Sequence, residues 1–286
     1  MVLIMKIIEF AKEMKIYSER FRLEGKKIAF VPTMGYFHEG HLFLMREAKK
    51  MADFLAVSIY VNPTQFGPRE DLSKYPRDFE RDAKMAQDVG VDVIFYPSNE
   101  EMYPRGYQTY VDVEEVTKNL CGLSRPVHFR GVTTICAKLF HIVKPHIAVF
   151  GKKDYQQYIT IKRMVTDLNM DLEIVGLPTV READGLAMSS RNVYLKEERP
   201  SALALIASLK LAQELYDQGE RESSKIISQV RKLISQAPYT DIDYVKICDT
   251  ETIKDVEKVG KGDFIALAVK VAKTRLIDNH VFGEKI

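Results

Sequence analysis

The sequence is poor in cysteine and nearly balanced in charge, and both features exclude whole classes of site. Only three cysteines occur, Cys121, Cys136 and Cys248, and none lies in the C-x-x-C spacing of a zinc cluster. Their scatter is typical of reduced thiols in a cytoplasmic protein. The chain holds 42 Lys plus Arg against 40 Asp plus Glu, a formal charge of +2. This balance argues against nonspecific nucleic-acid binding, so any anion site must be local.

The chain also lacks a long apolar run. No segment approaches the roughly 20 apolar residues of a membrane-spanning helix. Residues 1–21 alternate apolar and charged side chains at helical spacing, unlike a signal peptide, and predict an N-terminal helix. There is no low-complexity tract and no repeat at the periods of solenoid proteins. With 286 residues, 46% of them hydrophobic, the composition predicts a soluble globular protein of two domains.

What the sequence does contain is an alternation of strand-like and helix-like segments. The predicted strands are 26–31, 53–61, 91–97, 146–151 and 171–178, and the helices between them are 40–52, 77–90, 131–145 and 154–169. Such an alternation predicts an α/β domain of the doubly wound, Rossmann-like class, with a parallel sheet and right-handed crossovers. Ligands of these sheets bind beyond the carboxyl ends of the strands.

The pattern changes at about Val180. Two helical stretches, 200–218 and 222–236, are followed by two strand-like runs, 241–249 and 263–279. Helices followed by strands predict a smaller α+β domain. We therefore divide the chain into residues 1–179 and residues 180–286, and expect a substrate to be enclosed between the two domains.

Two of the six histidines stand three residues apart at a predicted strand-to-helix junction. In VPTMGYFHEGHLFLMREAKK, residues 31–50, His38 and His41 follow the first strand, beside Gly35 and Gly40. The first N–H groups of a helix lack intrahelical partners and, with the helix dipole, attract an anion such as phosphate. Residues three apart share one helix face, so both imidazoles can point at one ligand. The glycines would let the backbone approach it closely.

The segment after the second strand offers amide and carboxylate groups. YVNPTQFGPREDLSKYPRDFERD, residues 60–82, contains Asn62, Gln65 and Asp82 among many turn residues. Gln65 is a candidate for orienting a polar substrate. Turn chemistry at Asn62 and Pro63 is the alternative explanation of this composition.

Two later segments offer cations and hydroxyl groups. FGKKDYQQ, residues 150–157, places Lys152 and Lys153 at the start of a predicted helix, where cations oppose the helix dipole unless they serve an anion. Asp154 in the same segment fits an ordinary N-cap. ADGLAMSSRN, residues 183–192, carries two serines and an arginine that can contact phosphate oxygens, although a solvated turn has a similar composition.

Taken in order, these segments resemble a known family. PTMGYFHEGH is similar to the HIGH-type motif of class I nucleotidylyl transferases. YVNPTQF, HFRGV, FGKKDYQQ, MSSRN and TRLIDN resemble the signature blocks of the pantothenate synthetases, from about Val31 to Asn279. The resemblance implies an ATP-dependent ligase that joins pantoate to β-alanine through a pantoyl adenylate, with release of diphosphate and AMP. It also implies Mg²⁺ with the ATP, a cytoplasmic homodimer, no nucleic-acid or membrane partner, and a second domain that closes over the ATP site.

The same resemblance implies roles for individual residues. The expected catalytic residues are His38, His41, Lys153 and Arg191. ATP is expected to contact Met34, Gly35, His38, His41, Gly151, Lys153, Asp154, Val180, Met188, Ser189, Ser190 and Arg191. Pantoate is expected to contact Gln65, Gln157, Asn62, Pro32 and Arg130. Family members often carry two adjacent acidic residues where this chain has Arg81 and Asp82, so either Asp82 alone or phosphates and water would hold the metal.

Two other functions fit parts of the pattern. A HIGH-motif adenylyl transferase that keeps AMP on its product would share residues 34–41 but need not share Gln65, Gln157 or TRLIDN. A nucleic-acid-binding module related to aminoacyl-tRNA synthetase cores is the second alternative. The near-zero net charge and the lack of a basic stripe argue against that module. Release of AMP that requires β-alanine would separate the ligase from the adenylyl transferase.

Overall fold

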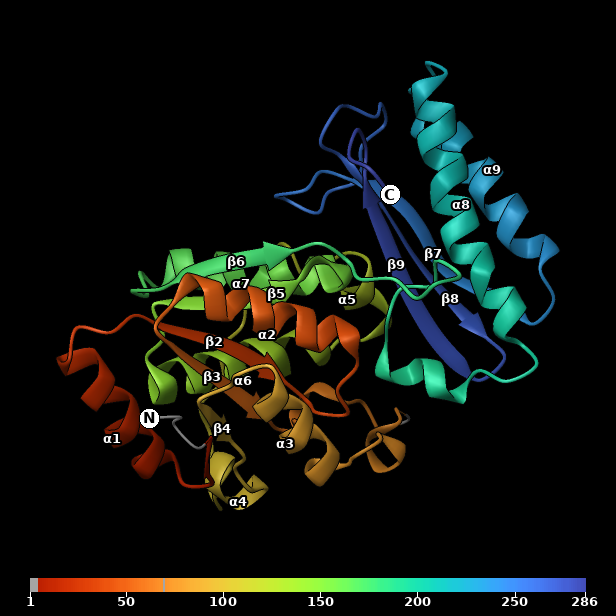
Figure 1. Ribbon diagram of the computed structural model, residues 1–286. Helices are drawn as coiled ribbons and strands as arrows, with labels where there is room; N and C mark the ends of the chain where they lie inside the picture. Colours follow the sequence, from red (N-terminus) through yellow and green to blue (C-terminus); the bar gives the residue numbers. More distant parts are fainter. Residues whose placement is uncertain (1–4, 69) are drawn as a thin grey trace. The chain divides into compact units, whose positions relative to one another are not determined.

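The computed structural model describes residues 5–68 and 70–286, and the chain divides into two compact units. Unit 1 consists of Met1–Val113, Arg125–Lys152 and Thr160–Pro178. Unit 2 consists of Glu114–Ser124, Lys153–Ile159 and Thr179–Ile286. Figure 1 shows the elements of both units. Among the described residues, no helix has both the length and the apolar character that crossing a bilayer requires.

Unit 1 is built on a six-stranded parallel sheet with the order β1-β4-β3-β2-β5-β6. Its strands are β1 (Lys6–Ile8), β2 (Ile28–Thr33), β3 (Phe54–Ile59), β4 (Val93–Phe95), β5 (Ile147–Gly151) and β6 (Glu173–Leu177). From β2 the chain moves outward through β3 and β4, then returns to the other side of β2 for β5 and β6. This reversal defines a doubly wound sheet and confirms the predicted fold class. Such sheets bind ligands at the carboxyl ends of the two strands beside the reversal, here β2 and β5.

Helices cover both faces of this sheet (Figure 1). The helices of this part of the chain are α1 (Ala11–Leu23), α2 (Glu39–Met51), α3 (Phe79–Asp88), α4 (Asn99–Met102), α6 (His128–Val143) and α7 (Tyr155–Asp167), with short 3₁₀ helices η1 (Pro63–Gln65) and η2 (Leu72–Lys74). The apolar stripe of α2 places Met45 and Ala48 in one cluster with Val31 and Val57 of the sheet. The apolar positions of the sequence therefore determine which face of α2 is buried, and with it the direction of the loop that precedes the helix.

The N-terminal segment differs from the prediction of one continuous helix. Residues 1–4 lie outside the described part of the chain, Lys6–Ile8 form β1, and the helix begins at Ala11. The Lys6 N–H donates to the Asp92 carbonyl, and the Tyr96 N–H donates to the Ile8 carbonyl. The helical prediction for this part was wrong because pairing with β4, far along the chain, overrides the local spacing of apolar residues.

Unit 2 contains a three-stranded antiparallel sheet with the order β7-β8-β9. Its strands are β7 (Thr240–Cys248), β8 (Phe264–Val271) and β9 (Thr274–Val281), and its helices are α5 (Cys121–Ser124), α8 (Arg199–Asp217), α9 (Ser223–Gln236) and the 3₁₀ helix η4 (Ser190–Tyr194). A further 3₁₀ helix, η3 (Lys152–Asp154), precedes α7. Leu209 of α8 and Val230 of α9 share a buried cluster with Leu267 of β8. The two helices therefore cover one face of this sheet.

The run 263–279 forms two strands and not one. A two-residue turn at Ala272 and Lys273 separates β8 from β9, and Ala272 has a positive φ of 51°. Hairpin turns with such backbone angles usually carry Asn-Gly or Asp-Gly, so the sequence lacked the usual turn signal. The consequence is that TRLIDN lies on the edge strand β9.

Candidate functional site

The loop after β2 is held in one shape by its own sequence. Gly35 has a φ of +82°, and a Cβ atom at this position would lie 2.9 Å from Cγ2 of Ile59. Both the backbone angle and the close approach therefore require glycine. The Thr33 hydroxyl donates to the carbonyl of Ser58 at 2.6 Å and accepts from the Gly35 N–H at 3.2 Å. These contacts fix the backbone that leads to the two histidines.

Asp82, from the first turn of α3, anchors the same loop. Its two carboxylate oxygens accept from the backbone N–H groups of Tyr36 at 2.5 Å and Phe37 at 2.7 Å. The side chain is buried. Burial raises the pKa of Asp82, and the two backbone hydrogen bonds oppose that increase. The residue predicted as a metal ligand is thus engaged in shaping the loop.

His38 and His41 lie side by side at the start of α2. The helix begins at Glu39, so His38 immediately precedes it. The two ring centroids are 4.1 Å apart, and the His38 N–H donates to Nδ1 of His41 at 3.4 Å. The structure therefore brings the two predicted imidazoles together beside the first N–H groups of a helix, a place that suits a phosphate.

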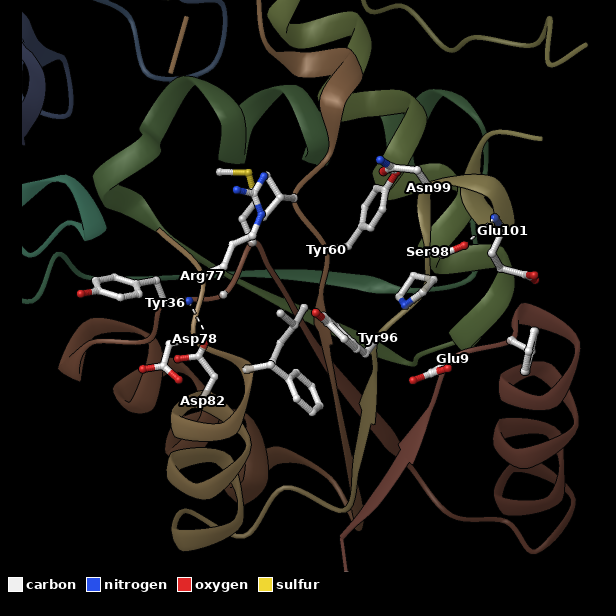
Figure 2. Close-up of a pocket in the computed structure, with 17 residues that line it drawn as sticks. Glu9, Tyr36, Tyr60, Arg77, Asp78, Asp82, Tyr96, Ser98, Asn99 and Glu101 are labelled. Atoms are coloured by element: carbon white, nitrogen blue, oxygen red, sulfur yellow. Dashed lines mark hydrogen bonds between the residues drawn. The ribbon is translucent and has the colours of Figure 1, made fainter. Parts of the chain in front are cut away.

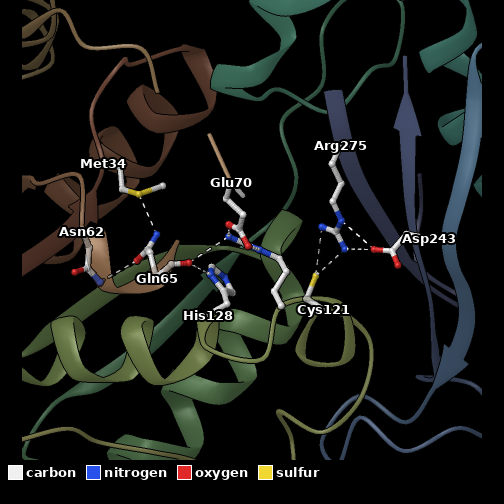
Figure 3. A network of polar contacts seen from close by, with 9 residues as sticks. Met34, Asn62, Gln65, Glu70, Cys121, His128, Asp243 and Arg275 are labelled. Atoms are coloured by element: carbon white, nitrogen blue, oxygen red, sulfur yellow. Dashed lines mark hydrogen bonds and ion pairs between the residues drawn. The ribbon is translucent and has the colours of Figure 1, made fainter. Parts of the chain in front are cut away.

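Gln65 belongs to a cluster of amide groups in unit 1 (Figure 3). Its side chain is buried, its Nε2 donates to Sδ of Met34 at 3.0 Å, and its Oε1 accepts from Nδ2 of Asn62 at 3.3 Å. The Asn62 amide also donates to the carbonyl of Gly131 at 3.0 Å. Nδ1 of His128 lies 3.0 Å from the Gln65 carbonyl. Three predicted residues, Met34, Asn62 and Gln65, therefore meet in one place.

Gly131 makes this cluster possible, although it was not among the residues predicted for the site. A Cβ atom on Gly131 would lie 2.5 Å from the Thr64 carbonyl oxygen and 2.6 Å from Cα of Gln65. Helix α6 can therefore pack against η1 only with glycine at this position. The signal was present as the glycine of the HFRGV block. Arg130 of the same block is exposed and lies over the ring of Tyr110, 4.2 Å from its centroid.

A cavity of about 490 Å³ opens beside the β2 loop (Figure 2). Three predicted site residues line it: Met34, Gly35 and Asp82. Tyr60 in its wall donates a hydrogen bond to Oδ1 of Asn99 at 2.9 Å, and burial raises the pKa of this phenol. The cavity lies beyond the carboxyl ends of β2, β3 and β4, and of these strands only β2 borders the reversal of strand order at which such sheets bind ligands.

Unit 2 holds the predicted residues that precede and begin α7. Nζ of Lys153 lies 3.6 Å from Oδ2 of Asp154, and the Lys153 carbonyl accepts from Nδ2 of Asn279 at 2.8 Å. Gln157 is partly exposed on the first turn of α7. Its neighbour Gln156 is buried and donates to the carbonyls of Val116 and Asn119. The two glutamines of this block therefore lie in different environments.

The segment from Val180 to Arg191 forms a tight, hydrogen-bonded turn in unit 2. The Met188 N–H donates to the Val180 carbonyl at 2.9 Å, which pairs two residues predicted to contact ATP. Ser189 caps η4 by accepting from the Arg191 N–H at 3.2 Å. Ser190 is the first residue of η4. The turn thus brings together Val180, Met188 and the Ser-Ser-Arg group.

The charged residues of the TRLIDN block, on β9, form ion pairs within unit 2. Arg275 pairs with Asp243 at 2.7 Å and lies 3.7 Å from Sγ of Cys121 (Figure 3). Asp278 is buried and paired with Arg181 at 2.7 Å. Arg181 was not among the predicted site residues, although it directly follows Val180.

The remaining predicted residues lie in the unit 1 sheet. Pro32 pairs with Ser58 across β2 and β3, and Gly151 ends β5 opposite Leu177. Within residues 5–68 and 70–286, no group of three His, Cys, Asp or Glu side chains could hold a metal ion. All three cysteines are free and buried.

Comparison with known proteins gives matches along nearly the whole chain. The sequence profile of the family described as Pantoate-beta-alanine ligase matches residues 6–281. A pantothenate synthetase of Syntrophus aciditrophicus (strain SB) is 67% identical over 283 residues, which cover 99% of each chain. A pantothenate synthetase of Geobacter sulfurreducens is 56% identical over 98% of this chain and 100% of its own.

Solved structures extend this similarity to three dimensions. A pantothenate synthetase from Thermus thermophilus superposes with a TM-score of 0.92 at 42% identity, covering 96% of this chain and 99% of its own. A pantoate-beta-alanine ligase from Francisella tularensis, complexed with beta-gamma ATP and beta-alanine, gives a TM-score of 0.77 at 31% identity, covering 97% and 98%.

Proposed function

The chain belongs to the pantoate–β-alanine ligase family, and from that premise we propose which of its residues carry the reaction. The family's activity is the ATP-dependent condensation of (R)-pantoate with β-alanine. The products are pantothenate, AMP and diphosphate, and the intermediate is pantoyl adenylate. The observation that carries our assignment is the rigid β2 loop, which presents two adjacent imidazoles at the start of α2.

In the first step the pantoate carboxylate attacks the α-phosphorus of ATP. A carboxylate oxygen forms the new bond to phosphorus, and diphosphate leaves with the electrons of the bond that breaks. Such a transfer needs positioning and stabilisation of charge more than covalent chemistry by the protein. We assign His38 and His41 to the phosphate oxygens, with the backbone of Met34 and Gly35 beside them. The hydrogen bond between the two histidines supports a fixed geometry.

The proposal assigns further residues to ATP. Lys153 and Arg191 are cations for the phosphates, and Ser189 and Ser190 are hydroxyl donors. The backbone at Gly151, Val180 and Met188 would border the nucleotide, together with Asp154. The paired backbone of Val180 and Met188 supports a defined shape for this part of the site.

Pantoate would be held by amide groups that can satisfy both its hydroxyls and its carboxylate. Gln65 is the strongest candidate, since its amide is fixed by Met34 and Asn62. Gln157 is assigned to the same substrate, and Pro32 borders it. Arg130 is assigned to pantoate as well, and to reach it the guanidinium would have to leave the ring of Tyr110.

In the second step the amine of β-alanine attacks the acyl carbon of pantoyl adenylate. A C–N bond forms, the C–O bond to AMP breaks, and the amine loses a proton. Diphosphate has already left, so the histidines and cations face much less negative charge than in the first step. We therefore expect them to act mainly on adenylate formation.

We propose that Mg²⁺ accompanies ATP and is held by phosphate oxygens and water. Asp82 does not fit the role of a metal ligand well, because it is buried and both of its oxygens accept backbone N–H groups. When bound to the phosphates, Mg²⁺ would neutralise part of their charge. The same proposal includes a cytoplasmic homodimer that acts on small molecules without a nucleic-acid partner.

The test is product analysis with the full chain. The protein is incubated with ATP, Mg²⁺ and pantoate, with and without β-alanine, and the products are separated by chromatography and identified by mass. We expect pantothenate and AMP only when β-alanine is present. A stable adenylylated product that needs no amine would show instead an adenylyl transferase that keeps AMP on its product.

A further inference from the structure

We propose that two adjacent residues of β9, Asp278 and Asn279, keep two segments of unit 2 at a fixed spacing. These are the segments around Lys153 and Ser189–Arg191, which the proposed function assigns to ATP. Asp278 acts through Arg181 on the turn that leads to Ser189–Arg191. Asn279 acts on the backbone of Lys153. Asp278, Asn279 and Arg181 are positioning residues, and the inference rests on the proposed function because it concerns the same ATP site.

Asp278 and Arg181 form a buried, two-pronged ion pair. Nη1 of Arg181 donates to Oδ2 of Asp278 at 2.7 Å, and Nη2 donates to Oδ1 at 3.1 Å. The Asp278 side chain is 1% exposed and that of Arg181 is 18% exposed. A buried charge is tolerated only when it is paired and hydrogen-bonded, so each residue fixes the other. The backbone N–H of Asn279 adds a third donor to Oδ1 of Asp278, at 2.9 Å.

Arg181 also contacts the turn that precedes Ser189. Its Nη1 also donates to the carbonyl of Gly185 at 3.2 Å. Gly185 has a φ of +93° and lies in a turn closed by the hydrogen bond from its own N–H to the Glu182 carbonyl at 2.8 Å. The backbone of this turn pairs Val180 with Met188, directly before Ser189. A shift of the Arg181 guanidinium would therefore move the segment that carries the Ser-Ser-Arg group.

Asn279 contacts the second segment, around Lys153, from the opposite face of the sheet. Successive side chains of a strand point to opposite faces. Asp278 pairs with Leu267, which belongs to the cluster under α8 and α9, whereas Asn279 pairs with Ala266. Nδ2 of Asn279 donates to the Lys153 carbonyl at 2.8 Å. The side chain of Tyr155, two residues further on, packs against Phe264 with ring centroids 4.6 Å apart.

The strand β9 thus fixes the spacing between two groups of residues that are proposed to bind the phosphates. Lys153 and Arg191 are far apart in the sequence, and each would otherwise depend on its own loop. Because catalytic geometry must be held closely, a shared strand behind both groups is an effective support. The prediction is that disturbing either contact weakens ATP binding while pantoate binding is retained.

The test compares three variants of the full chain at a single near-neutral pH. Arg181→Lys keeps the charge opposite Asp278 but removes the planar fork that reaches both Asp278 and Gly185. We expect the dissociation constant of a nonhydrolysable ATP analogue, measured by calorimetry, to rise roughly tenfold. Asn279→Ala removes the neutral hydrogen bond to Lys153, so the expected rise is roughly twofold to tenfold. The KM for pantoate should stay at the parent value in both variants.

His280→Gln is the matched control. His280 is buried on the same face of β9 as Asp278, and its Nε2 lies 2.8 Å from Oε1 of Gln213 on α8, outside both ATP segments. Burial lowers the pKa of this imidazole, so at near-neutral pH its replacement removes no charge from beside Arg181. This variant should lower the thermal midpoint but leave the affinity for the ATP analogue unchanged. Equal weakening of ATP binding in His280→Gln and Arg181→Lys would overturn the inference, since it would reveal only general destabilisation. Unchanged ATP binding in both Arg181→Lys and Asn279→Ala would overturn it as well.

The remaining outcomes are also decisive. If Arg181→Lys fails to fold, Asn279→Ala alone decides, because its side chain is only partly buried and carries no charge. If the parent protein binds the ATP analogue but forms no pantothenate, the proposed ligase activity fails while the inference on β9 is still tested by binding. If the parent does not bind the analogue, both fail.

Discussion

Gln156 and Gln157 are adjacent on α7, and the structure gives them different surroundings. Gln156 donates to the carbonyls of Val116 and Asn119 and accepts from the Cys121 N–H. Gln157 is partly exposed. Residue type and position in the sequence would not distinguish the two. Only the contacts indicate that the first is structural and that the second is available to a substrate.

We predict that Gln157→Ala raises the KM for pantoate roughly twofold to tenfold, because in the proposed function this amide forms a neutral hydrogen bond to the substrate. The affinity for the ATP analogue should not change. Gln156→Ala is the control: it should reduce the free energy of unfolding by about 1–3 kcal/mol, since buried groups lose their partner, and leave the KM unchanged. Steady-state kinetics and urea unfolding measure both. A normal pantoate KM in Gln157→Ala would refute the assignment.

His41 provides a prediction about a single step of the reaction. Loss of one preorganised donor to a developing oxyanion typically slows a reaction by about 10²–10³. We expect His41→Ala to slow adenylate formation by about that factor, while pantoyl adenylate supplied from outside reacts with β-alanine at the parent rate. Rapid-quench measurement of each half-reaction provides the test.

The exposed His141 on α6 is the control for that experiment, and His141→Ala should leave both half-reactions unchanged. Equal slowing of the two half-reactions in His41→Ala would mean that this imidazole supports the site as a whole. A first half-reaction at the parent rate would remove it from the mechanism.

At the scale of elements, His280 of β9 contacts α8, and protonation of this histidine affects the stability of the fold. Burial lowers the pKa of His280 to about 4 from its ordinary 6.5; the nearby Arg181 also lowers it, and Asp217 partly opposes this. The folded pKa lies below the unfolded pKa, so the fold favours the neutral ring. The stability that this ring contributes is complete above pH 6.5 and is lost as the pH falls toward 4.

We therefore predict that the urea midpoint of the parent falls between pH 6.5 and pH 4 more steeply than that of His280→Gln. His141→Gln, at an exposed position, should keep the slope of the parent. The measurement is a set of urea unfolding curves at several pH values. Parallel curves for the parent and His280→Gln would show that protonation of His280 does not oppose folding.

At the scale of the whole molecule, the proposed homodimer gives a direct prediction. Sedimentation equilibrium at micromolar protein should give twice the chain mass of 32.8 kDa. The support for this proposal is membership of the family. A single species of one chain mass at every concentration would contradict it, and it would leave the proposed chemistry intact because each assigned residue belongs to one chain.

The fold class and the segments of the candidate site could be predicted from local patterns along the chain. Strands and helices can be predicted from apolar periods of about two and 3.6 residues, which are local properties. The polar groups after β2, β3 and β5 could be placed at one sheet edge because parallel strands end together. The order of the motifs, from His38 to Asn279, is likewise a property of the chain alone.

Which side chains are exposed and which support the candidate site depends on contacts between residues far apart in the sequence. Asp82 proved to be bonded to the backbone of Tyr36 and Phe37, and Gly131 to be the point of contact for η1. Likewise, β1 exists because β4 lies beside it, and Arg181 meets Asp278 across 97 positions of sequence. Such pairings depend on which elements become neighbours in space. Local periodicity carries no information on that choice, because contact between distant residues is settled by the packing of the whole unit.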